Sequence, residues 1–151
     1  MKLQLSVQYA VMRAGLPAKS SIRRWAHVAL KGLRRRRTAV GVRIVGAAES
    51  AQLNFRFRHK RNPTNVLSFP FEAPPGLRSE ILGDLVICAP VVRREARVQH
   101  KPLHAHWAHM VVHGILHLRG YDHQKPRDAA VMEQMEIRIL KELGYANPYL
   151  Q

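Results

Sequence analysis

Three histidines in the C-terminal half of the chain are spaced for metal binding. His113 and His117 lie four residues apart, so on a helix both imidazoles project from one face, one turn apart. Gly120 offers a place for that helix to end in a left-handed turn, after which the chain can double back and bring His123 toward the first two. Three neutral imidazoles that converge make a tripod for a divalent metal ion, with a fourth position left open for water. The pattern predicts a catalytic metal site rather than a closed structural one.

The spacing from His113 to His123 is also that of the long zinc signature of metzincin peptidases. In that signature a glutamate follows the first histidine and acts as the general base. Here the position is Gly114, so a peptidase built on this helix would lack its usual base. This substitution disfavours a metalloprotease.

The charge of the chain favours a polyanionic partner. Its 25 Lys and Arg residues outnumber 10 Asp and Glu residues, which gives a formal net charge of +15. Such an excess is typical of proteins that bind nucleic acid. An anionic membrane surface is the other option, but no basic amphipathic helix has a strongly apolar face, and no apolar run has the length of a transmembrane helix. Cys88 is the one cysteine, so no disulfide can form within the chain, and the cytoplasm is the expected location.

Hydrophobic periodicity predicts a single α+β domain over residues 1–151, with a long helix that carries the metal site at its end. The expected strands span 2–8, 38–45, 66–69 and 81–88, and the last two pair antiparallel. The expected helices span about 21–34, 47–57, 90–98, 103–119 and 127–143, the first capped by Ser20 or Ser21. The strand 81–88 reads as buried on both faces, so Asp84 within it is expected to have a structural hydrogen-bonding role near the site.

Several arginines and phenylalanines could serve either the fold or RNA binding. The run Arg34 to Arg37 is a solvated helix end or a phosphate-contacting patch, and the two are compatible. Aromatic side chains of the second helix and third strand are expected in the core, although they could stack on bases; they are Phe55, Phe57 and Phe69. Further outer phosphate contacts are expected from Arg93, Arg94 and Arg97.

Several blocks of the sequence resemble one known family. The blocks are HGILHLRGYDH from His113 to His123, LNFRFRHKRNPTNVLSFPFE from Leu53 to Glu72, LGDLVIC from Leu82 to Cys88, and the C-terminal pattern from Met132 through LGYANPY. They are similar, in the same order, to the signatures of the YbeY family, the metal-dependent bacterial endoribonucleases of ribosomal RNA maturation. The likeness covers most of the chain.

The resemblance implies both a fold and an activity. It implies a mixed four-stranded sheet flanked by about five helices, and one zinc-like ion held by His113, His117 and His123. It implies cleavage of single-stranded RNA, a role in forming the 3′ end of small-subunit (16S) ribosomal RNA, and a part in ribosome quality control with ribosomal proteins or the small subunit as partners. Arg58 matches the arginine that the family is thought to use in catalysis. Family members often have an acidic residue where this chain has Arg61, so the loop is wholly basic here.

The residues are consistent with metal-assisted phosphodiester cleavage. A metal held by three histidines polarises a phosphoryl oxygen and lowers the pKa of water. Arg58 could clamp the same phosphate with two hydrogen bonds, and Lys60 and Arg61 could add phosphate contacts. The nucleophile is either water or the RNA 2′-hydroxyl, and the second would explain a preference for RNA.

The general base is open at the level of the sequence. Asp122 is a candidate base, an orienting residue or a turn residue. His109, one turn before His113, could reach the substrate, orient a ligand or pack. Three histidines suit zinc, nickel or copper, with zinc the first expectation. The competing hypothesis is a non-catalytic RNA-binding ribosome-assembly factor whose metal is structural.

Overall fold

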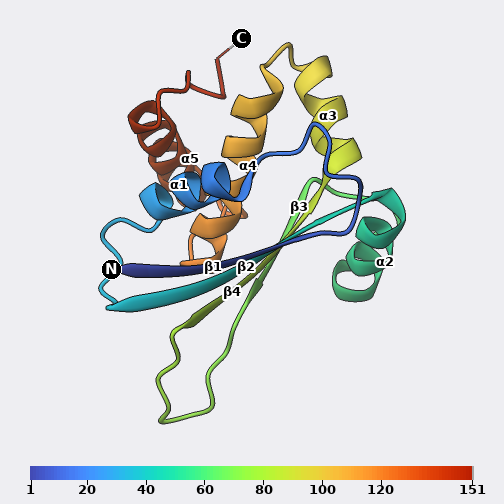
Figure 1. The fold of residues 1–151 in the computed structure, drawn as a ribbon. Coiled ribbons are helices and arrows are strands. Elements are labelled where there is room, and N and C mark those ends of the chain that lie inside the picture. The colour runs from blue at the N-terminus through green and yellow to red at the C-terminus, as the bar shows by residue number, and fades with distance from the viewer. Residues whose placement is uncertain (151) are drawn as a thin grey trace.

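Strands with alternating buried residues build a four-stranded sheet. In the computed structural model, which describes residues 1–150, these strands are β1 (Lys2–Tyr9), β2 (Arg37–Val45), β3 (Val66–Pro70) and β4 (Ile81–Cys88). Their order is β1-β2-β4-β3, with β1, β2 and β4 parallel and β3 antiparallel to β4 (Figure 1). The mixed sheet and the antiparallel pairing of the last two strands are therefore confirmed.

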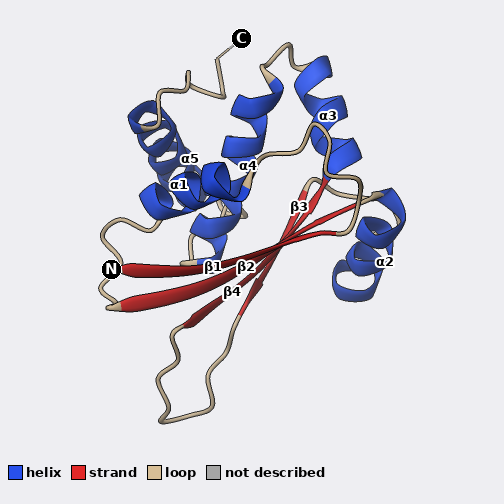
Figure 2. Ribbon diagram, viewed as in Figure 1, coloured by secondary structure: helices blue, strands red, loops and turns tan. Residues whose placement is uncertain are grey.

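Five helices complete the α+β fold, as predicted. They are α1 (Lys19–Ala29), α2 (Ala47–Arg58), α3 (Ala89–Val98), α4 (Leu103–Leu118) and α5 (Pro126–Glu142). The main core lies between one face of the sheet and the group formed by α1, α4 and α5, while α2 packs on the opposite face with a smaller cluster (Figures 1 and 2). Among the described residues, no helix combines the length and apolarity needed to cross a bilayer.

The first helix is shorter than its pattern suggested. It begins at Lys19, with Ala18 as an N-cap that makes no side-chain hydrogen bond, so the prediction of a Ser20 or Ser21 cap is wrong. It ends at Ala29, because Gly32, with a φ of 84°, follows in a turn that no other residue type adopts as readily. The arginine run 34–37 therefore lies beyond the helix, on the way into β2.

One face of the sheet is only partly covered, and this overturns two sequence predictions. Asp84 is exposed rather than buried, and its carboxylate lies over Gly41 of the neighbouring strand. Phe55 and Phe57 are 51% and 54% exposed rather than in the core. The reason is that α2 covers only one end of this face, so β4 is not buried on both sides along its whole length. Phe69 is partly buried and contacts the Phe57 ring, with the ring centroids 5.0 Å apart.

Helix α4 lies very close to the sheet at Gly114. A Cβ atom at this position would be 2.7 Å from Leu85 Cδ2 and 2.9 Å from Leu85 Cδ1 of β4. The position where a metzincin has its glutamate therefore faces the fully buried Leu85 instead of the solvent-accessible histidine face. A longer side chain has no room there, which adds a packing reason to the absence of that base.

We expect Gly114→Ala to lower the free energy of unfolding by about 1–3 kcal/mol, because the new methyl group would overpack the contact with Leu85. The sign is informative, since glycine to alanine in a helix interior otherwise stabilises by about 1 kcal/mol. Urea denaturation measures the change. In a Leu85→Ala background the same substitution should be neutral or stabilising. An equal loss of unfolding free energy in both backgrounds would show that the contact with Leu85 is not the cause.

Candidate metal centre

A tight turn after α4 brings the third histidine back to the first two. The Gly120 amide donates to the His117 carbonyl, and the Tyr121 amide donates to the Leu116 carbonyl, each over 3.0 Å. This is the Schellman pattern, and Gly120 has the positive φ, 99°, that it requires. The predicted reversal at Gly120 is confirmed. The chain after it returns along the helix and places His123 beside His117.

Asp122 shapes this turn through its side chain. Its Oδ1 accepts hydrogen bonds from the backbone amides of His123, over 2.7 Å, and Gln124, over 3.2 Å. These two bonds fix the backbone on both sides of the third histidine. Of the three sequence interpretations of Asp122, the geometry therefore supports the turn residue.

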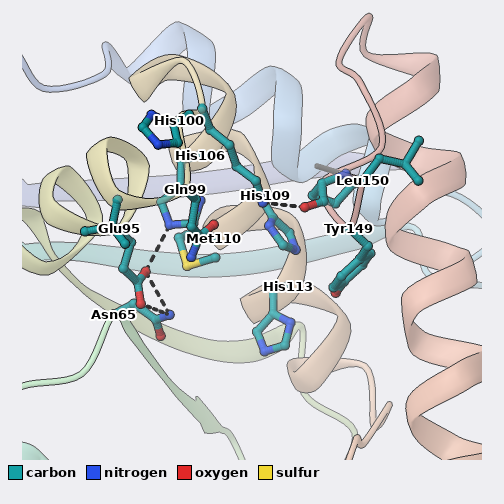
Figure 3. A pocket seen from close by; sticks show the side chains of 13 residues that line it. Asn65, Glu95, Gln99, His100, His106, His109, Met110, His113, Tyr149 and Leu150 are labelled. Carbon is teal, nitrogen blue, oxygen red and sulfur yellow. Dashed lines mark hydrogen bonds and ion pairs between the residues drawn. The ribbon is translucent and has the colours of Figure 1, made fainter.

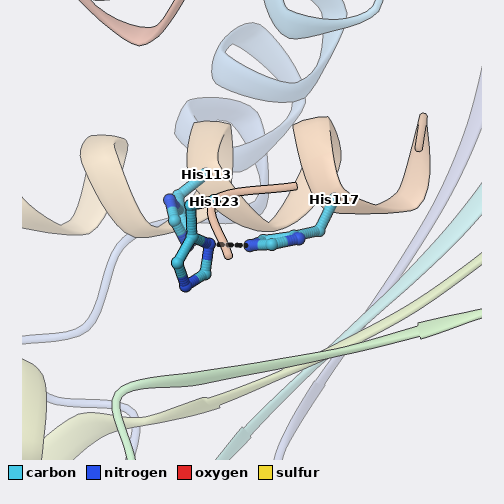
Figure 4. A group of neighbouring side chains, drawn as sticks. All are labelled: His113, His117 and His123. Carbon is cyan, nitrogen blue, oxygen red and sulfur yellow. Dashed lines mark hydrogen bonds between the residues drawn. The ribbon is translucent and has the colours of Figure 1, made fainter. Parts of the chain in front are cut away.

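The three histidines that the sequence singled out face one another (Figure 4). Ring nitrogens of His113, His117 and His123 all lie within 4.8 Å of one another. The closest pair, His117 Nε2 and His123 Nδ1, is 3.0 Å apart, a separation suited to two ligands on one ion with bonds of about 2.0–2.1 Å. His113 and His117 are half-buried and His123 is exposed, so this group could hold a metal ion and keep one side open to solvent.

The protonation state of His117 suits a metal ligand. Burial, and then the nearby imidazoles of His113 and His123, lower the pKa of His117 to about 4. Its imidazole is therefore neutral at pH 7, and a lone pair is available without the loss of a proton.

A buried carboxylate that sequence reasoning missed stands behind the tripod. Glu136 of α5 is 1% exposed. It accepts a hydrogen bond from His113 Nδ1 over 2.8 Å and another from His109 Nε2. Burial alone would raise the pKa of Glu136, but the hydrogen bonds from His109 and His113 outweigh it and lower the pKa to about 2. The group is therefore a carboxylate at neutral pH.

This carboxylate determines which nitrogen of His113 is free. An ionised carboxylate can only accept, so His113 Nδ1 must carry the hydrogen. The lone pair is then on His113 Nε2, the other side of the ring. A carboxylate that accepts from the remote nitrogen of a ligating histidine is the usual support of such ligands, because it fixes the tautomer and the ring orientation.

The C-terminal tail completes the same network. The Tyr149 hydroxyl donates to Glu136 Oε2 over 2.7 Å, and burial, together with this bond, raises the pKa of Tyr149. The tail reaches this point because Gly144 ends α5 with a second Schellman turn, in which the Tyr145 amide donates to the Leu140 carbonyl over 2.8 Å. His109, whose role the sequence left open, is thus a buried partner of Glu136 rather than a residue of the solvent-exposed site.

A signal for Glu136 was present in the sequence. It lies four residues after Met132 and three before Ile139, two apolar residues that are buried in the structure. A glutamate in the middle of a buried helical stripe needs a hydrogen-bonding partner, and the histidine face of α4 supplies it.

His109, His113 and Glu136 form a second group with ligand atoms within 4.8 Å of one another. In this group, however, His109 and His113 already donate to the two carboxylate oxygens. Within the tripod, His117 Nε2 and His123 Nδ1 are close enough to share one hydrogen bond, but a metal ion would replace that bond without displacing a carboxylate from its donors, so the tripod is the better metal candidate.

The tripod opens into a pocket of about 800 Å³. Arg58, at the last turn of α2, lines this pocket together with the three histidines. The two other predicted phosphate contacts, Lys60 and Arg61, are exposed in the following loop and are not part of the described pocket lining. Asp122 is the one carboxylate among the described lining residues, and one of its oxygens is used in the turn.

Comparisons with known proteins agree on one family. The family described as Endoribonuclease YbeY matches residues 12–144. The chain is 57% identical to a protein named Endoribonuclease YbeY from Alkalilimnicola ehrlichii over 97% of this chain and 91% of that protein. It is 53% identical to one of the same name from Stenotrophomonas maltophilia, over 98% and 94%. The solution structure of TM1509 from Thermotoga maritima, 21% identical, superposes with a TM-score of 0.61 over 99% of both chains and supports the fold.

We expect Glu136→Gln to weaken metal binding by about 10- to 100-fold, because an amide supports the His113 tautomer less well than a carboxylate. Competition with a chromophoric chelator measures the affinity. The matched control is Glu133→Gln, which removes one negative charge from an exposed position of the same helix. Equal affinity in the two variants would contradict a supporting role for Glu136.

Proposed function

The chain belongs to the YbeY family of endoribonucleases, and we propose that it cleaves single-stranded ribosomal RNA with the help of one metal ion held by His113, His117 and His123. As an endoribonuclease it hydrolyses internal phosphodiester bonds. The observation that carries the metal assignment is the convergence of three histidine ring nitrogens beside an open pocket, with Glu136 bonded to His113 on its far side.

Zinc is the ion we propose for this site. Three imidazoles with a free fourth position suit it, and the bound ion would act as a Lewis acid on a phosphoryl oxygen and lower the pKa of water. The protein supplies the rest: a neutral His117, a fixed His113 tautomer, and a pocket lined by Arg58.

Arg58 is proposed to orient the phosphate that is cut. Its backbone position is fixed by the end of α2, where His59 adopts a left-handed conformation with a φ of 59° and its amide donates to the Phe55 carbonyl over 3.0 Å. A guanidinium at the rim of the tripod pocket can grip two phosphate oxygens at once. Lys60 and Arg61, exposed in the loop that follows α2, are proposed to bind neighbouring phosphates of the RNA strand.

The biological substrate that we propose is the precursor of small-subunit (16S) ribosomal RNA, cut near its 3′ end in the cytoplasm, with the small ribosomal subunit or its proteins as partners. The formal net charge of +15 supports a polyanionic partner of this kind. A histidine group that is open to solvent, beside a pocket lined by Arg58, gives no support to a purely structural metal.

We expect His117→Ala to lose both the bound metal and RNA cleavage while the fold survives, because His117 is half-buried at the edge of the core. Elemental analysis, circular dichroism and a cleavage assay on ribosomal RNA precursor give the three readouts. His27→Ala, which changes an exposed histidine on α1, is the control. Cleavage by metal-free His117→Ala at the level of the control would rule out the metal-dependent mechanism.

We expect Arg58→Ala to reduce kcat/KM for RNA by roughly 10²-fold without loss of metal, because a charged donor to the phosphate is removed. Arg58→Lys should recover only part of this loss, since lysine cannot form the paired hydrogen bonds. The control is Arg56→Ala, an exposed arginine of the same helix whose guanidinium lies over the Phe57 ring. If Arg58→Ala has no greater effect than Arg56→Ala, a role at the scissile phosphate is excluded.

A further inference from the structure

A second cavity, of about 870 Å³, lies behind the tripod. It is bounded by the end of α3, the first half of α4 and the C-terminal tail (Figure 3). Asn65 and His113 line both this cavity and the tripod pocket, so the two hollows meet at a proposed metal ligand. A strand of RNA with one phosphate at the tripod has this cavity immediately next to it.

One wall of the cavity is polar and held in place. Glu95 accepts a hydrogen bond from His106 Nε2 over 2.9 Å, and Asn65 Nδ2 lies 3.2 Å from both of its oxygens. The amide of Asn65 is oriented by a further bond, in which the Val66 backbone amide donates to Asn65 Oδ1 over 2.6 Å. Neither side chain is therefore free to turn away.

This wall offers acceptors to a ligand. Burial raises the pKa of Glu95, but the hydrogen bonds from His106 and Asn65 bring the pKa below its usual value, so the group is a carboxylate. A carboxylate accepts about four hydrogen bonds, and among residues 1–150 Glu95 Oε2 has the shared contact with Asn65 alone. Asn65 Oδ1 likewise has a second lone pair. The side chain of Glu95 is 28% exposed, so these acceptors are within reach of a bound molecule.

The opposite side of the cavity has an aromatic surface. Tyr149 is 44% exposed as a residue, and its ring packs edge-on against His109, with ring centroids 5.6 Å apart. Its hydroxyl is tied to Glu136, so the ring is fixed in place. Met110 adds an apolar contact to the floor. Flat rings of nucleobases stack on such surfaces, and single-stranded RNA is commonly bound in this way.

The dimensions and the charge fit a nucleotide. His106, at the polar wall, precedes His113 by seven residues on α4, which is about 10 Å along the helix axis and leaves room for one nucleotide between phosphate and base edge. Arg94 and Arg97 are exposed on α3, the helix that carries Glu95, and would attract the sugar-phosphate backbone outside the cavity.

We propose that this cavity binds the base of a nucleotide adjacent to the scissile phosphate, and that Glu95 with Asn65 selects guanine. Guanine is the standard base that presents two adjacent N–H donors, and the wall presents fixed acceptors. Uracil, with one N–H between two carbonyl oxygens, is the poorest match. The proposal rests on the proposed function for the position of the phosphate, but the binding of the base does not require cleavage.

The test uses the zinc-loaded, full-length, ¹⁵N-labelled protein and the four nucleoside 5′-monophosphates, followed by NMR. We expect GMP to shift the amides of Asn65, Gln99 and Met110 and to bind roughly tenfold more tightly than UMP. Glu95→Gln should remove this preference while metal content stays unchanged, and Glu133→Gln is the matched control. Equal binding of all four nucleotides, or shifts confined to Arg58 and the tripod, would overturn the proposal.

Two further measurements keep the result interpretable. Val98→Trp is a second variant for the case in which Glu95→Gln does not fold. Val98 lies at the rim of the cavity and is 69% exposed, so a tryptophan there should block GMP binding without disturbing the core. Sequencing of cut RNA should show guanine enriched beside the cut, and Glu95→Gln should raise KM for these sites more than it lowers kcat. GMP binding without any RNA cleavage would contradict the proposed nuclease function and support the base-binding cavity. RNA cleavage without a base preference would support the nuclease function and contradict the base-binding cavity.

Discussion

The hydrogen bonding of the buried Glu136 carboxylate is the interaction on which the site depends. A charge this deep is tolerated only if its oxygens are saturated by donors, and the chain supplies three: His109, His113 and Tyr149. The donors come from α4 and from the tail, while the acceptor comes from α5. One hydrogen-bond network therefore joins three segments and, through His113, sets the orientation of the tripod. Removal of the carboxylate would loosen the proposed metal site and the tail together.

Helix α4 has two faces with different requirements. One face packs so closely on β4 that Gly114 has no room for a side chain beyond hydrogen. The other face carries histidines with three distinct duties. His106 supports the Glu95 wall, His109 supports Glu136, and His113 with His117 faces the tripod. Because the first face cannot shift without overpacking Leu85, the positions of the histidines are fixed by the hydrophobic core.

Much of the fold and the histidine tripod could be predicted from local sequence. Among the described residues, periodicity predicted eight of the nine elements to within one residue at each end, whereas α1 ended five residues earlier than predicted. The Gly120 turn was predictable because it needs only a glycine with positive φ. The predictions that failed concerned residues whose environment depends on contacts between distant segments. Asp84 was misplaced because the extent to which α2 covers the sheet is not encoded in β4 itself. Glu136 was missed because its histidine partners lie 23 and 27 residues away, although its place in an apolar stripe marked it as unusual.

The most direct test of the account is the position of the metal itself. Crystals of the zinc-loaded protein, with diffraction data collected at the zinc absorption edge, would locate the ion in an anomalous difference map. The account predicts one peak among the ring nitrogens of His113, His117 and His123, with Glu136 still bonded to His113 Nδ1. A peak among His109, His113 and Glu136, or none at the tripod, would contradict it.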